Sequence, residues 1–469
     1  MSEKTFHITI VGGGITGLTA AFYLQREIEA GGLPIRLQLI EEQERLGGKI
    51  KTWRHEGYVI EQGPDSFLER KVSAAQLAVD LGLSDDLVRN STGQAYIWHK
   101  DKLVAIPEGA VMGVPTKLMP FVSTDLISWP GKIRAAADLV LPASEGNGDI
   151  SVGDFFRRRL GDEVIENLIQ PLLSGVYSGD IDNLSLLASF PQFAQLEKQH
   201  RSLILAMKHS RPKANGQGKP KGLFLTLKNG LESLVEGIEE RLPASSIQKG
   251  TGVQELVKRK NGGYSLILKN GQSMETDAVL FTLPHAALEP LLRPYVSVPS
   301  LPQAKPHMVA TVAMAFSEKS IDFGMDGTGF IVPRHSGAKI TACTWAHRKW
   351  PHTAPDNKAL LRGFVGKAKE QSFMQQTDEE VLETVLHDLR KIMSIPKQPD
   401  FYKVTRLQNA IPYVVGHLEW VKEVKAKIQT SLPGVLLAGA SYSGVGVPDC
   451  IDQGKKAVSE LIASVGPGR

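Results

Sequence analysis

The chain has 469 residues, a net charge of +4 and only two cysteines, Cys343 and Cys450. At roughly 150 residues per domain, this length predicts about three folding units. Apolar residues make up 42% and charged residues 22%, which excludes a disordered, collagen-like or coiled-coil chain. The cysteine content excludes a disulfide scaffold or a four-cysteine metal site and suits a reducing compartment. The net charge is too small to predict nucleic-acid binding.

No targeting or anchoring segment is evident. Residues 1–6 are polar, and no stretch reaches the ~20 apolar residues that span a bilayer. We therefore expect a soluble, cytoplasmic protein that is at most weakly peripheral on a membrane. Residues 208–222 are rich in Lys, Gly and Pro and contain no acid. They predict a mobile loop, which is either simply solvated or meets an anionic surface or a partner enzyme.

The N-terminal segment predicts one βαβ unit of a parallel sheet. Residues 7–11 (HITIV) are typical of a short buried strand. Glycines follow, then a helical pattern from Ile15 to about Glu29, and then a second strand over Arg36–Glu41. Strand, glycine turn, helix and strand in this order indicate a Rossmann-type domain.

The remainder of the chain alternates helical and strand patterns. We expect an amphipathic helix over 154–173 that ends near Pro171, a hairpin in 264–283 that turns at Asn270-Gly271, and a surface helix over 377–393. The C-terminal region predicts a strand over 435–438, a glycine-rich turn and a helix from about Gln453.

This order predicts an α/β fold with α+β inserts. A nucleotide-binding βαβ unit comes first, long inserts follow, and another strand–glycine–helix unit comes last. We expect a cofactor-binding domain built from 1–89, 230–300 and 430–469. A substrate-binding domain would comprise 190–229 and 301–429, and a helical insert 90–189.

Gly12, Gly14 and Gly17 form a G-x-G-x-x-G pattern after the first strand and at the start of the helix. The first glycine permits a tight turn, the second lets the backbone approach a pyrophosphate, and the third lets helix and strand pack. The helix N-terminus offers free N–H groups to phosphates. Glu41 ends the second strand, where an acid hydrogen-bonds ribose hydroxyls. Because strand, glycines, helix and acid coincide, the pattern favours dinucleotide binding over a bare glycine turn.

A second glycine segment follows closely as Arg45-Leu46-Gly47-Gly48-Lys49. An NAD site has no need of it. A second close backbone approach with two cations suits the longer FAD, although a polar loop with a double-glycine bend would have the same sequence.

Four segments together resemble a known family. GGGITGLTAAFYL, EEQERLGGKI, EQGPDSF and GASYSGVGVPDCIDQG are similar to the flavin-containing porphyrinogen oxidases, which belong to the amine-oxidase-like flavoproteins. Within that group the chain resembles the soluble type of Gram-positive bacteria, over about residues 5 to 465. GPDSFLERK, PLLSGVYSGDIDNLS, ITACTW and GVGVPDCIDQG narrow the resemblance. It implies an amine-oxidase/p-hydroxybenzoate-hydroxylase-like fold with non-covalent FAD.

The resemblance also implies where FAD lies. It places the pyrophosphate on Gly12, Gly13, Gly14, Ile15, Thr16 and Gly17, the ribose on Glu41 with Glu42 and Lys49 nearby, the flavin along Gly63, Pro64, Asp65 and Ser66, the adenine edge on the Val253 backbone, and the flavin tail under Val447, Pro448 and Asp449. Without the resemblance, Val253 would be interpreted as an ordinary core valine. Relatives carry Trp where this chain has Leu407, and the following segment is one residue shorter, so the flavin contact expected there is not carried over.

For the substrate, the resemblance implies a cation that meets a carboxylate. Lys71 is the first candidate and Arg70 the second, although a lysine in this position is often only solvated. Gly175 and Val176 match a segment that lines the porphyrinogen cavity in relatives, and glycine there lets a flat ring approach backbone. Ile331 would be an apolar wall, or else ordinary sheet core.

The implied reaction is oxidation of coproporphyrinogen III, and also protoporphyrinogen IX, to the porphyrin in haem biosynthesis. It would proceed in three two-electron steps, with oxygen as acceptor and hydrogen peroxide as by-product. The cofactor carries the chemistry, so we expect no catalytic side chain and no metal. A transient contact with the next enzyme of the pathway would suit a reactive product. The physiological porphyrinogen and the oligomeric state stay open.

Two alternatives use the same scaffold. An amine oxidase would show an aromatic pair before the last helix, where this chain has Tyr442 alone. A carotenoid desaturase belongs with the amine oxidase to the first, enzymatic alternative, and a flavin-free regulator is the second. A flavin-free regulator of prenylated GTPases would lose the flavin-side contacts, whereas Gly47-Gly48 and Gly63-Pro64 persist here. Cys450 lies in the flavin-tail motif, but its spacing does not match the attachment cysteine of amine oxidases.

Overall fold

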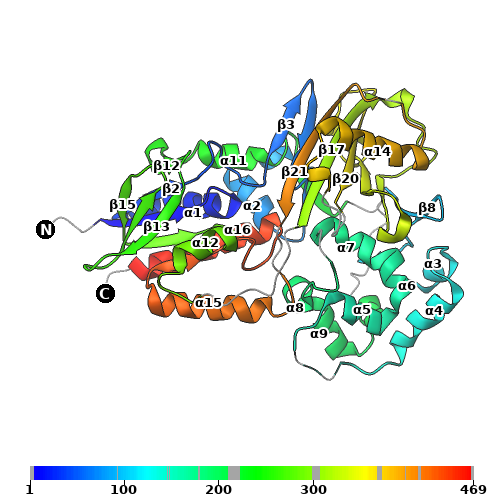
Figure 1. The fold of residues 1–469 in the computed structure, drawn as a ribbon, viewed down its shortest axis with the longest axis horizontal. Helices are drawn as coiled ribbons and strands as arrows, with labels where there is room; N and C mark the ends of the chain where they lie inside the picture. The colour runs from blue at the N-terminus through cyan, green and yellow to red at the C-terminus, as the bar shows by residue number, and fades with distance from the viewer. Residues whose placement is uncertain are drawn as a thin grey trace.

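The computed structural model describes residues 5–91, 93–144, 146, 148–177, 180–209, 222–297, 307–366, 372–396, 398–409 and 413–465. Figure 1 shows a parallel sheet with its helices on the left, a second sheet at the upper right and a group of helices at the lower right. Most of the basic segment predicted as a loop, residues 210–221, lies outside the described residues.

The first sheet is parallel, has five strands and confirms the Rossmann-type prediction. Its order is β12-β2-β1-β16-β22, from β12 (Ile247–Gln248), β2 (Ile35–Ile40), β1 (Phe6–Val11), β16 (Ala278–Phe281) and β22 (Val435–Leu437). The strands predicted over 7–11, 36–41 and 435–438 are therefore confirmed within one residue at each end.

Both faces of this sheet are buried, as parallel sheets require. Ile8 and Ile10 of β1 pack into the core on one face, whereas Val11 belongs to the core on the other. The first core is closed by α1 (Ile15–Gly31), α2 (Ser73–Asp80), α11 (Glu232–Glu239) and α16 (Val447–Val465). The second is closed by α12 (His285–Leu292), α15 (His417–Ser431) and the antiparallel strands β13 (Val253–Lys258), β14 (Tyr264–Leu268) and β15 (Ser273–Thr276). The hairpin predicted at Asn270-Gly271 joins β14 to β15.

The second sheet has seven strands. Its order is β21-β17-β20-β19-β18-β7-β8, from β21 (Phe401–Asn409), β17 (His307–Ser317), β20 (Lys358–Val365), β19 (Ile340–Trp345), β18 (Gly329–Ile331), β7 (Ala95–His99) and β8 (Lys102–Ala105). Helix α14 (Asp378–Ile392) covers one face and begins with a capping box between Thr377 and Glu380. The helix predicted over 377–393 is thereby confirmed.

Helices dominate the region between β8 and β11. They are α3 (Leu118–Ser123), α4 (Trp129–Ala136), α5 (Val152–Leu160), α6 (Asp162–Val164), the π-helical turn Ile165–Ile169, α7 (Gln170–Tyr177), α8 (Leu186–Ser189), α9 (Pro191–His200) and α10 (Leu203–His209). The single helix expected over 154–173 is wrong. Gly161, with φ of +86°, ends α5, and Pro171 lies in the first turn of α7 rather than at a helix end.

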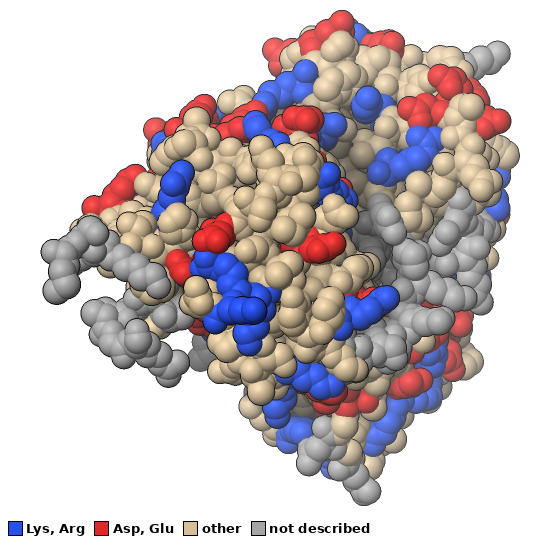
Figure 2. All heavy atoms as spheres, turned by 60° about the vertical axis from the view of Figure 1, so that its left-hand side comes forward, with Lys and Arg blue, Asp and Glu red and all other residues tan. Residues whose placement is uncertain are grey.

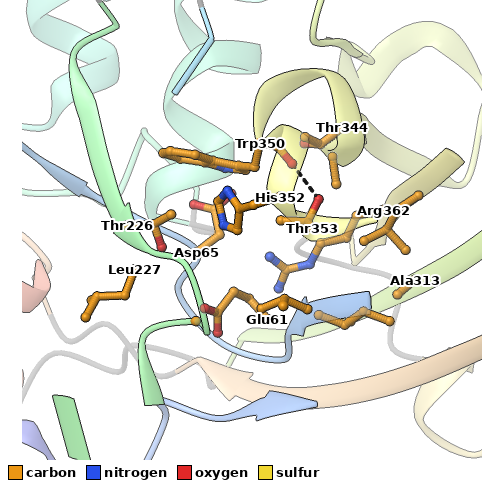
Figure 3. Close-up of a pocket in the computed structure, with 15 residues that line it drawn as sticks. Glu61, Asp65, Thr226, Leu227, Ala313, Thr344, Trp350, His352, Thr353 and Arg362 are labelled. Carbon is orange, nitrogen blue, oxygen red and sulfur yellow. Dashed lines mark hydrogen bonds between the residues drawn. The ribbon is translucent and has the colours of Figure 1, made fainter. Parts of the chain in front are cut away.

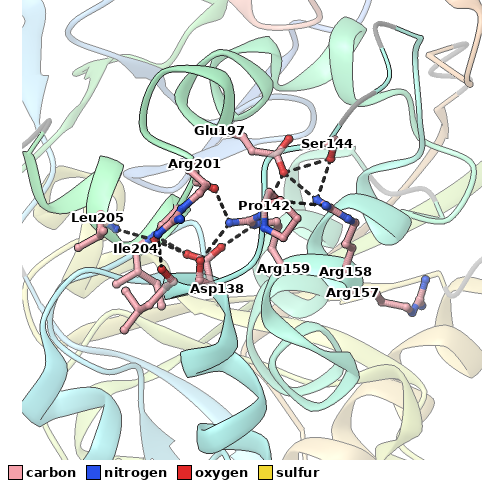
Figure 4. Close-up of polar contacts among 12 residues, drawn as sticks. Asp138, Pro142, Ser144, Arg157, Arg158, Arg159, Glu197, Arg201, Ile204 and Leu205 are labelled. Atoms are coloured by element: carbon pink, nitrogen blue, oxygen red, sulfur yellow. Dashed lines mark hydrogen bonds and ion pairs between the residues drawn. The ribbon is translucent and has the colours of Figure 1, made fainter.

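A buried ion cluster holds this helical region together (Figure 4). Arg159 and Asp138 are fully buried, and Arg159 Nε donates to Asp138 Oδ1 at 2.6 Å. Arg159 Nη1 lies 3.3 Å from Glu197 Oε1, and the Ser202 hydroxyl donates to Asp138 at 2.6 Å. Each buried charge therefore has an opposite charge or a hydrogen-bond partner, which such groups need in a core.

Short strands connect the larger units. They are the hairpin β3 (Thr52–His55) and β4 (Tyr58–Glu61), the sheet of β5 (Phe67–Leu68), β11 (Phe224–Leu227) and β6 (Leu87–Arg89), and the pair β9 (Ala110–Val111) and β10 (Val114–Pro115). Among the described residues, no helix is both long and apolar enough to cross a bilayer. On the face turned forward in Figure 2, basic and acidic side chains are interspersed.

The division into domains stays a prediction. Strands β7 and β8 begin the range assigned to the helical insert, yet they pair with β18 in the seven-stranded sheet. Strand β11 lies in a range assigned to the substrate domain and pairs with β5 and β6. Helix α15 lies almost wholly in the second range assigned to the substrate domain, 301–429, while its buried side chains join the core beneath the parallel sheet. Several strands and helices near the predicted boundaries therefore pair or pack with a unit other than the one assigned to them.

Candidate active site

The carboxyl end of β1 and the start of α1 form a tight glycine turn. The N–H of Gly12, with φ of +111°, donates to the Ile40 carbonyl at 2.8 Å. The Thr282 hydroxyl donates to the Gly12 carbonyl at 2.9 Å. A Cβ on Gly17 would lie 1.9 Å from that same carbonyl oxygen. Only glycine therefore lets the first turn of α1 pack against β1.

The second glycine segment lies directly beside the first. Gly47 donates to the Gly13 carbonyl at 2.8 Å, and Gly14 and Gly47 form a parallel bridge. Gly14 is the N-cap of α1, and no side chain caps it. The first N–H groups of a helix have no intrahelical acceptor. These two backbone segments consequently form a cradle of main-chain donors at a positive helix end, which suits phosphate oxygens.

Glu41 lies at the edge of this cradle. Its carboxylate accepts from Gly13 N at 2.6 Å and from Gln43 N at 2.8 Å, so backbone donors fix its orientation. Each carboxylate oxygen has a second lone pair, which leaves capacity for ribose hydroxyls. The neighbouring Glu42 is exposed and forms an ion pair with Lys269. Val253 is buried at the start of β13. This position is compatible both with a core valine and with a backbone contact to adenine.

The Gly63-Pro64-Asp65-Ser66 turn follows β4 and is tightly enclosed. A Cβ on Gly63 would lie 1.8 Å from the Lys49 carbonyl oxygen, so this turn runs in contact with the second glycine segment. On the other side, Arg362 Nη2 donates to the Gly63 carbonyl at 2.9 Å. The predicted flavin-side turn is therefore held between the parallel-sheet unit and the seven-stranded sheet.

Asp65 in this turn is surrounded by donors. Ser66 Oγ donates to Oδ1 at 2.6 Å, and Lys349 Nζ lies 3.1 Å from Oδ2. Burial favours the neutral acid, but the charges of Lys349 and Arg362 outweigh it and hold the pKa of Asp65 below its usual value. Asp65 is thus an anchored carboxylate rather than a proton carrier.

A small cavity, lined mostly by apolar groups but also by several polar ones, lies behind the turn (Figure 3). Glu61, Asp65 and Arg362 line it, together with Trp350 and His352, and the Arg362 guanidinium and the Glu61 carboxyl point into the same space. Burial raises the pKa of Glu61 to about 7, although hydrogen bonds from Leu231 N and Thr52 Oγ1 and the charge of Arg362 oppose the shift. Of these residues, only Asp65 was predicted from the sequence.

Lys71 and Asp449 meet beside this region. Lys71 Nζ lies 2.6 Å and 2.7 Å from the two carboxylate oxygens of Asp449. Ser73 Oγ donates to the Pro448 carbonyl at 3.0 Å, which joins the start of α2 to the start of α16. Helix α16 begins at Val447, so the helix start expected near Gln453 is wrong by six residues. The structure thus brings Lys71, Pro448 and Asp449 together.

The other substrate candidates lie farther along the fold. Ile331 is half-buried in β18 and pairs with Ala342 and Ile97 on the neighbouring strands. Gly175 and Val176 belong to α7, but the surroundings of their side chains lie outside what the structure describes. Arg70 is exposed. The cavity role of all four stays a prediction.

Two further details bear on the cofactor. Leu407 lies half-buried in β21 opposite Val309 of β17. Cys450 is buried in the first turns of α16, and burial raises the pKa of its thiol to about 11. A thiol in this state is a poor nucleophile, which is consistent with non-covalent cofactor binding.

Several residues with clear electrostatic roles escaped sequence analysis, namely Glu61, Asp180, Arg334, Lys349 and Arg362. Arg334 follows Ile331 by three residues, and its Nη1 lies 3.3 Å from Asp180 Oδ1. Arg362 stands within the apolar run ALLRGFV. A charged residue in the middle of an apolar strand is the one signal that could have indicated a buried cation with polar partners elsewhere in the fold.

The parallel sheet, the cradle at its carboxyl edge and the acid after β2 define a dinucleotide-binding oxidoreductase fold. The cradle suits the pyrophosphate of a dinucleotide, because the two glycine segments leave unhindered backbone at a helix N-terminus. A family model described as "Flavin containing amine oxidoreductase" matches residues 15–462. The chain therefore belongs to the flavin-containing amine oxidoreductases.

Two curated relatives narrow the comparison. The chain is 50% identical over 466 residues to "Coproporphyrinogen III oxidase" of Bacillus subtilis (strain 168), covering 98% of this chain and 99% of the relative. It is 42% identical over 476 residues to the protein of the same name from Staphylococcus aureus (strain NCTC 8325 / PS 47), covering 98% and 100%. A crystal structure from Exiguobacterium sp. 255-15 is 39% identical and superimposes with a TM-score of 0.87, covering 98% and 99%. Within the family, the chain groups with bacterial proteins named coproporphyrinogen III oxidase.

Proposed function

We propose that this protein is an FAD-dependent oxidase that converts coproporphyrinogen III, and also protoporphyrinogen IX, to the porphyrin in haem biosynthesis. Oxygen would be the electron acceptor and hydrogen peroxide the by-product. The observation that carries this proposal is 50% identity, over nearly the whole of both chains, to a protein named coproporphyrinogen III oxidase. The glycine cradle and the enclosed turn after β4 support it, because a larger flavin dinucleotide needs both.

The residues that would hold FAD lie on the elements described above. Gly12–Gly17 would bind the pyrophosphate, and Glu41 would bind the ribose, with Glu42, Lys49 and the Val253 backbone beside it. Gly63–Ser66 and Val447–Asp449 would flank the flavin. The flavin, when bound, supplies two-electron redox chemistry that no protein side chain can supply.

The protein's own contribution is to bind and orient the substrate. A porphyrinogen with carboxylates needs cations at the mouth of its site, and Lys71 is the proposed anchor. Ile331, Gly175 and Val176 would offer apolar and flat backbone surface to the macrocycle. We nominate no general base. Asp65 is held ionised by two cations, and Glu61 lies in the cavity behind the turn.

Aerobic turnover tests this proposal. Purified protein is mixed with coproporphyrinogen III or with protoporphyrinogen IX, and porphyrin fluorescence, oxygen uptake and peroxide are followed together. For each porphyrin formed, the proposal predicts that three equivalents of oxygen are consumed and three of hydrogen peroxide are released, since three two-electron steps are needed. Heat-released cofactor should co-elute with FAD and not FMN. Turnover of amines with no porphyrin formed, or a protein that stays colourless with added FAD, would overturn it.

The division of the chain is part of the same proposal. Residues 1–89, 230–300 and 430–469 would form the FAD-binding domain, with the strand exchanges described above at their edges. The seven-stranded sheet would provide the substrate side. The Gly63–Ser66 turn lies between the two, which is where a flavin must be to meet a substrate.

A further inference from the structure

We propose that Arg362 and Lys349 are positioning residues that fix the Gly63–Ser66 turn from the side of the seven-stranded sheet. The inference rests on the proposed function, in which the flavin lies along this turn. Neither residue needs to contact the substrate. Each would act through the backbone or the carboxylate of the turn, and thereby set the geometry and the electrostatic potential at the flavin.

Arg362 makes a direct connection between the two units. It lies on β20, in the seven-stranded sheet, and is only 8% exposed. Its Nη2 donates to the Gly63 carbonyl at 2.9 Å, and its guanidinium lies 5.2 Å from the centre of the Phe364 ring. A charged donor to a backbone carbonyl in a buried site is worth more than a surface contact, because no water replaces it when it is lost.

Lys349 makes the second connection. It ends α13 (Ala346–Lys349), which follows β19. Its Nζ lies 3.1 Å from Asp65 Oδ2. It also lies 5.5 Å from the centre of the Trp350 ring and 5.6 Å from the centre of the Phe224 ring. The side chain is 22% exposed, so its ion pair with Asp65 is partly shielded from solvent. Arg362 and Lys349 thus hold adjacent points of one turn.

The turn cannot retreat from these contacts. A Cβ on Gly63 would overlap the Lys49 carbonyl oxygen at 1.8 Å, so the chain already touches the second glycine segment. Contacts on both sides therefore restrict the movement of this turn. Because reaction rates depend steeply on the placement of reacting groups, a turn that slackens would reduce turnover more than binding.

The charges around the turn are also balanced by these two cations. Asp65 faces Lys349, Arg362 and the Ser66 hydroxyl, and Glu61 faces Arg362 as well as Leu231 N and Thr52 Oγ1. Arg362 is the cation that both acids share. Its guanidinium Nε is buried and has no hydrogen-bond partner among the described residues. Loss of Arg362 would leave the region more negative and disfavour the addition of electrons nearby.

The test compares Arg362→Gln, Arg362→Lys and Lys349→Gln with a matched control. Lys358 lies four residues from Arg362 on the same strand and forms an exposed ion pair with Asp400 at 2.8 Å, so Lys358→Gln removes a cation of β20 without touching the turn. For each holoprotein, the flavin midpoint potential is measured by reductive titration without substrate. The FAD dissociation constant, the kcat and KM for coproporphyrinogen III and the thermal midpoint are measured alongside.

We expect Arg362→Gln to make the flavin potential more negative and to lower kcat about tenfold, with KM changed less than about threefold. Arg362→Lys should recover part of both losses, because it restores the charge but not the fixed fork. Lys349→Gln should show a smaller change in the same direction, and Lys358→Gln none. Lys349→Gln keeps the test decisive if Arg362→Gln does not fold.

A folded, flavin-loaded Arg362→Gln or Lys349→Gln with the wild-type potential and kcat would overturn the inference. A change in KM alone would also do so, since it would mean that these residues bind substrate. The potential requires no porphyrinogen, so it separates the two proposals. A protein that binds no flavin contradicts the proposed function, whereas a flavin-loaded variant with an unchanged potential contradicts only the role of the turn.

Discussion

Lys71 and Asp449 are 378 positions apart in the chain, and Lys71 Nζ contacts both carboxylate oxygens of Asp449, at 2.6 Å and 2.7 Å. The pair joins the segment before α2 to the first turn of α16. The cation proposed to anchor a substrate carboxylate therefore already has a carboxylate partner. A substrate must share Lys71 with Asp449 or displace it.

This geometry predicts opposite effects of two substitutions on substrate binding. Lys71→Met should raise the KM for coproporphyrinogen III about fivefold, equivalent to about 1 kcal/mol for a partly exposed charged contact. Asp449→Asn keeps the shape and frees the ammonium, so KM should stay the same or fall when FAD is saturating. Steady-state kinetics checks this. Equal increases in KM for both variants would show that Lys71 acts only through Asp449.

Two glycines of the cradle should respond differently to alanine. A Cβ on Gly14 meets nothing within 4 Å, and its φ of −71° suits alanine, so the apoprotein should keep its fold. That methyl group would stand in the space assigned to the pyrophosphate, and we expect FAD affinity to fall at least about tenfold. Gly17→Ala places Cβ 1.9 Å from the Gly12 carbonyl and should destabilise the fold itself. Circular dichroism and FAD titration distinguish the two, and normal FAD binding by Gly14→Ala would contradict the cradle.

The raised pKa of Glu61 should make the free energy of unfolding depend on pH. Its pKa in the folded protein is raised to about 7, whereas the unfolded chain has the ordinary value near 4.5. The folded state therefore binds more protons between these values, and this group's contribution to stability is present below pH ~4.5 and is lost as pH rises through ~7, by at most about 3 kcal/mol. Glu61→Gln removes that dependence. Denaturant unfolding from pH 5 to pH 8 should show the variant becoming more stable relative to wild type as pH rises, and a constant difference would contradict the shift.

The ion cluster of the helical region should be sensitive to loss of one partner. Arg159→Met leaves Asp138 and Glu197 buried without their shared cation, which costs about 3–5 kcal/mol of unfolding free energy. The neighbouring Arg157 is only half-buried and pairs with the more exposed Asp182, so Arg157→Met should cost less than about 1 kcal/mol. Urea unfolding monitored by circular dichroism compares the two. Equal losses would mean that burial of the Arg159 cluster contributes nothing.

The parts of the fold that local sequence specifies were predictable. Strand, glycine turn, helix and strand from Phe6 to Ile40 follow from short-range periodicity and glycine positions, and the surface helix over 377–393 follows from periodicity as well. The start of α16 had a usable signal, because Pro448 stands in its first turn, where proline is favoured. The break at Gly161 was hidden by an apolar pattern that continues across it.

Long-range pairing was not predictable from a single sequence. The seven-stranded sheet joins β7 and β8, near residue 100, to strands beyond residue 307, and no local pattern specifies that neighbour relation. The contacts of Arg362 with Gly63 and of Lys349 with Asp65 likewise join distant segments. The glycine cradle was therefore accessible from sequence, whereas the cations that enclose the flavin-side turn required the structure.

The central claim is that this flavoprotein oxidises a porphyrinogen, and anaerobic mixing tests it most directly. Yellow holoprotein is mixed without oxygen with coproporphyrinogen III and, separately, with protoporphyrinogen IX, and flavin absorbance is followed. We expect the flavin bands to bleach, and then to return together with porphyrin fluorescence when air is admitted. Flavin that stays oxidised with both porphyrinogens would contradict it.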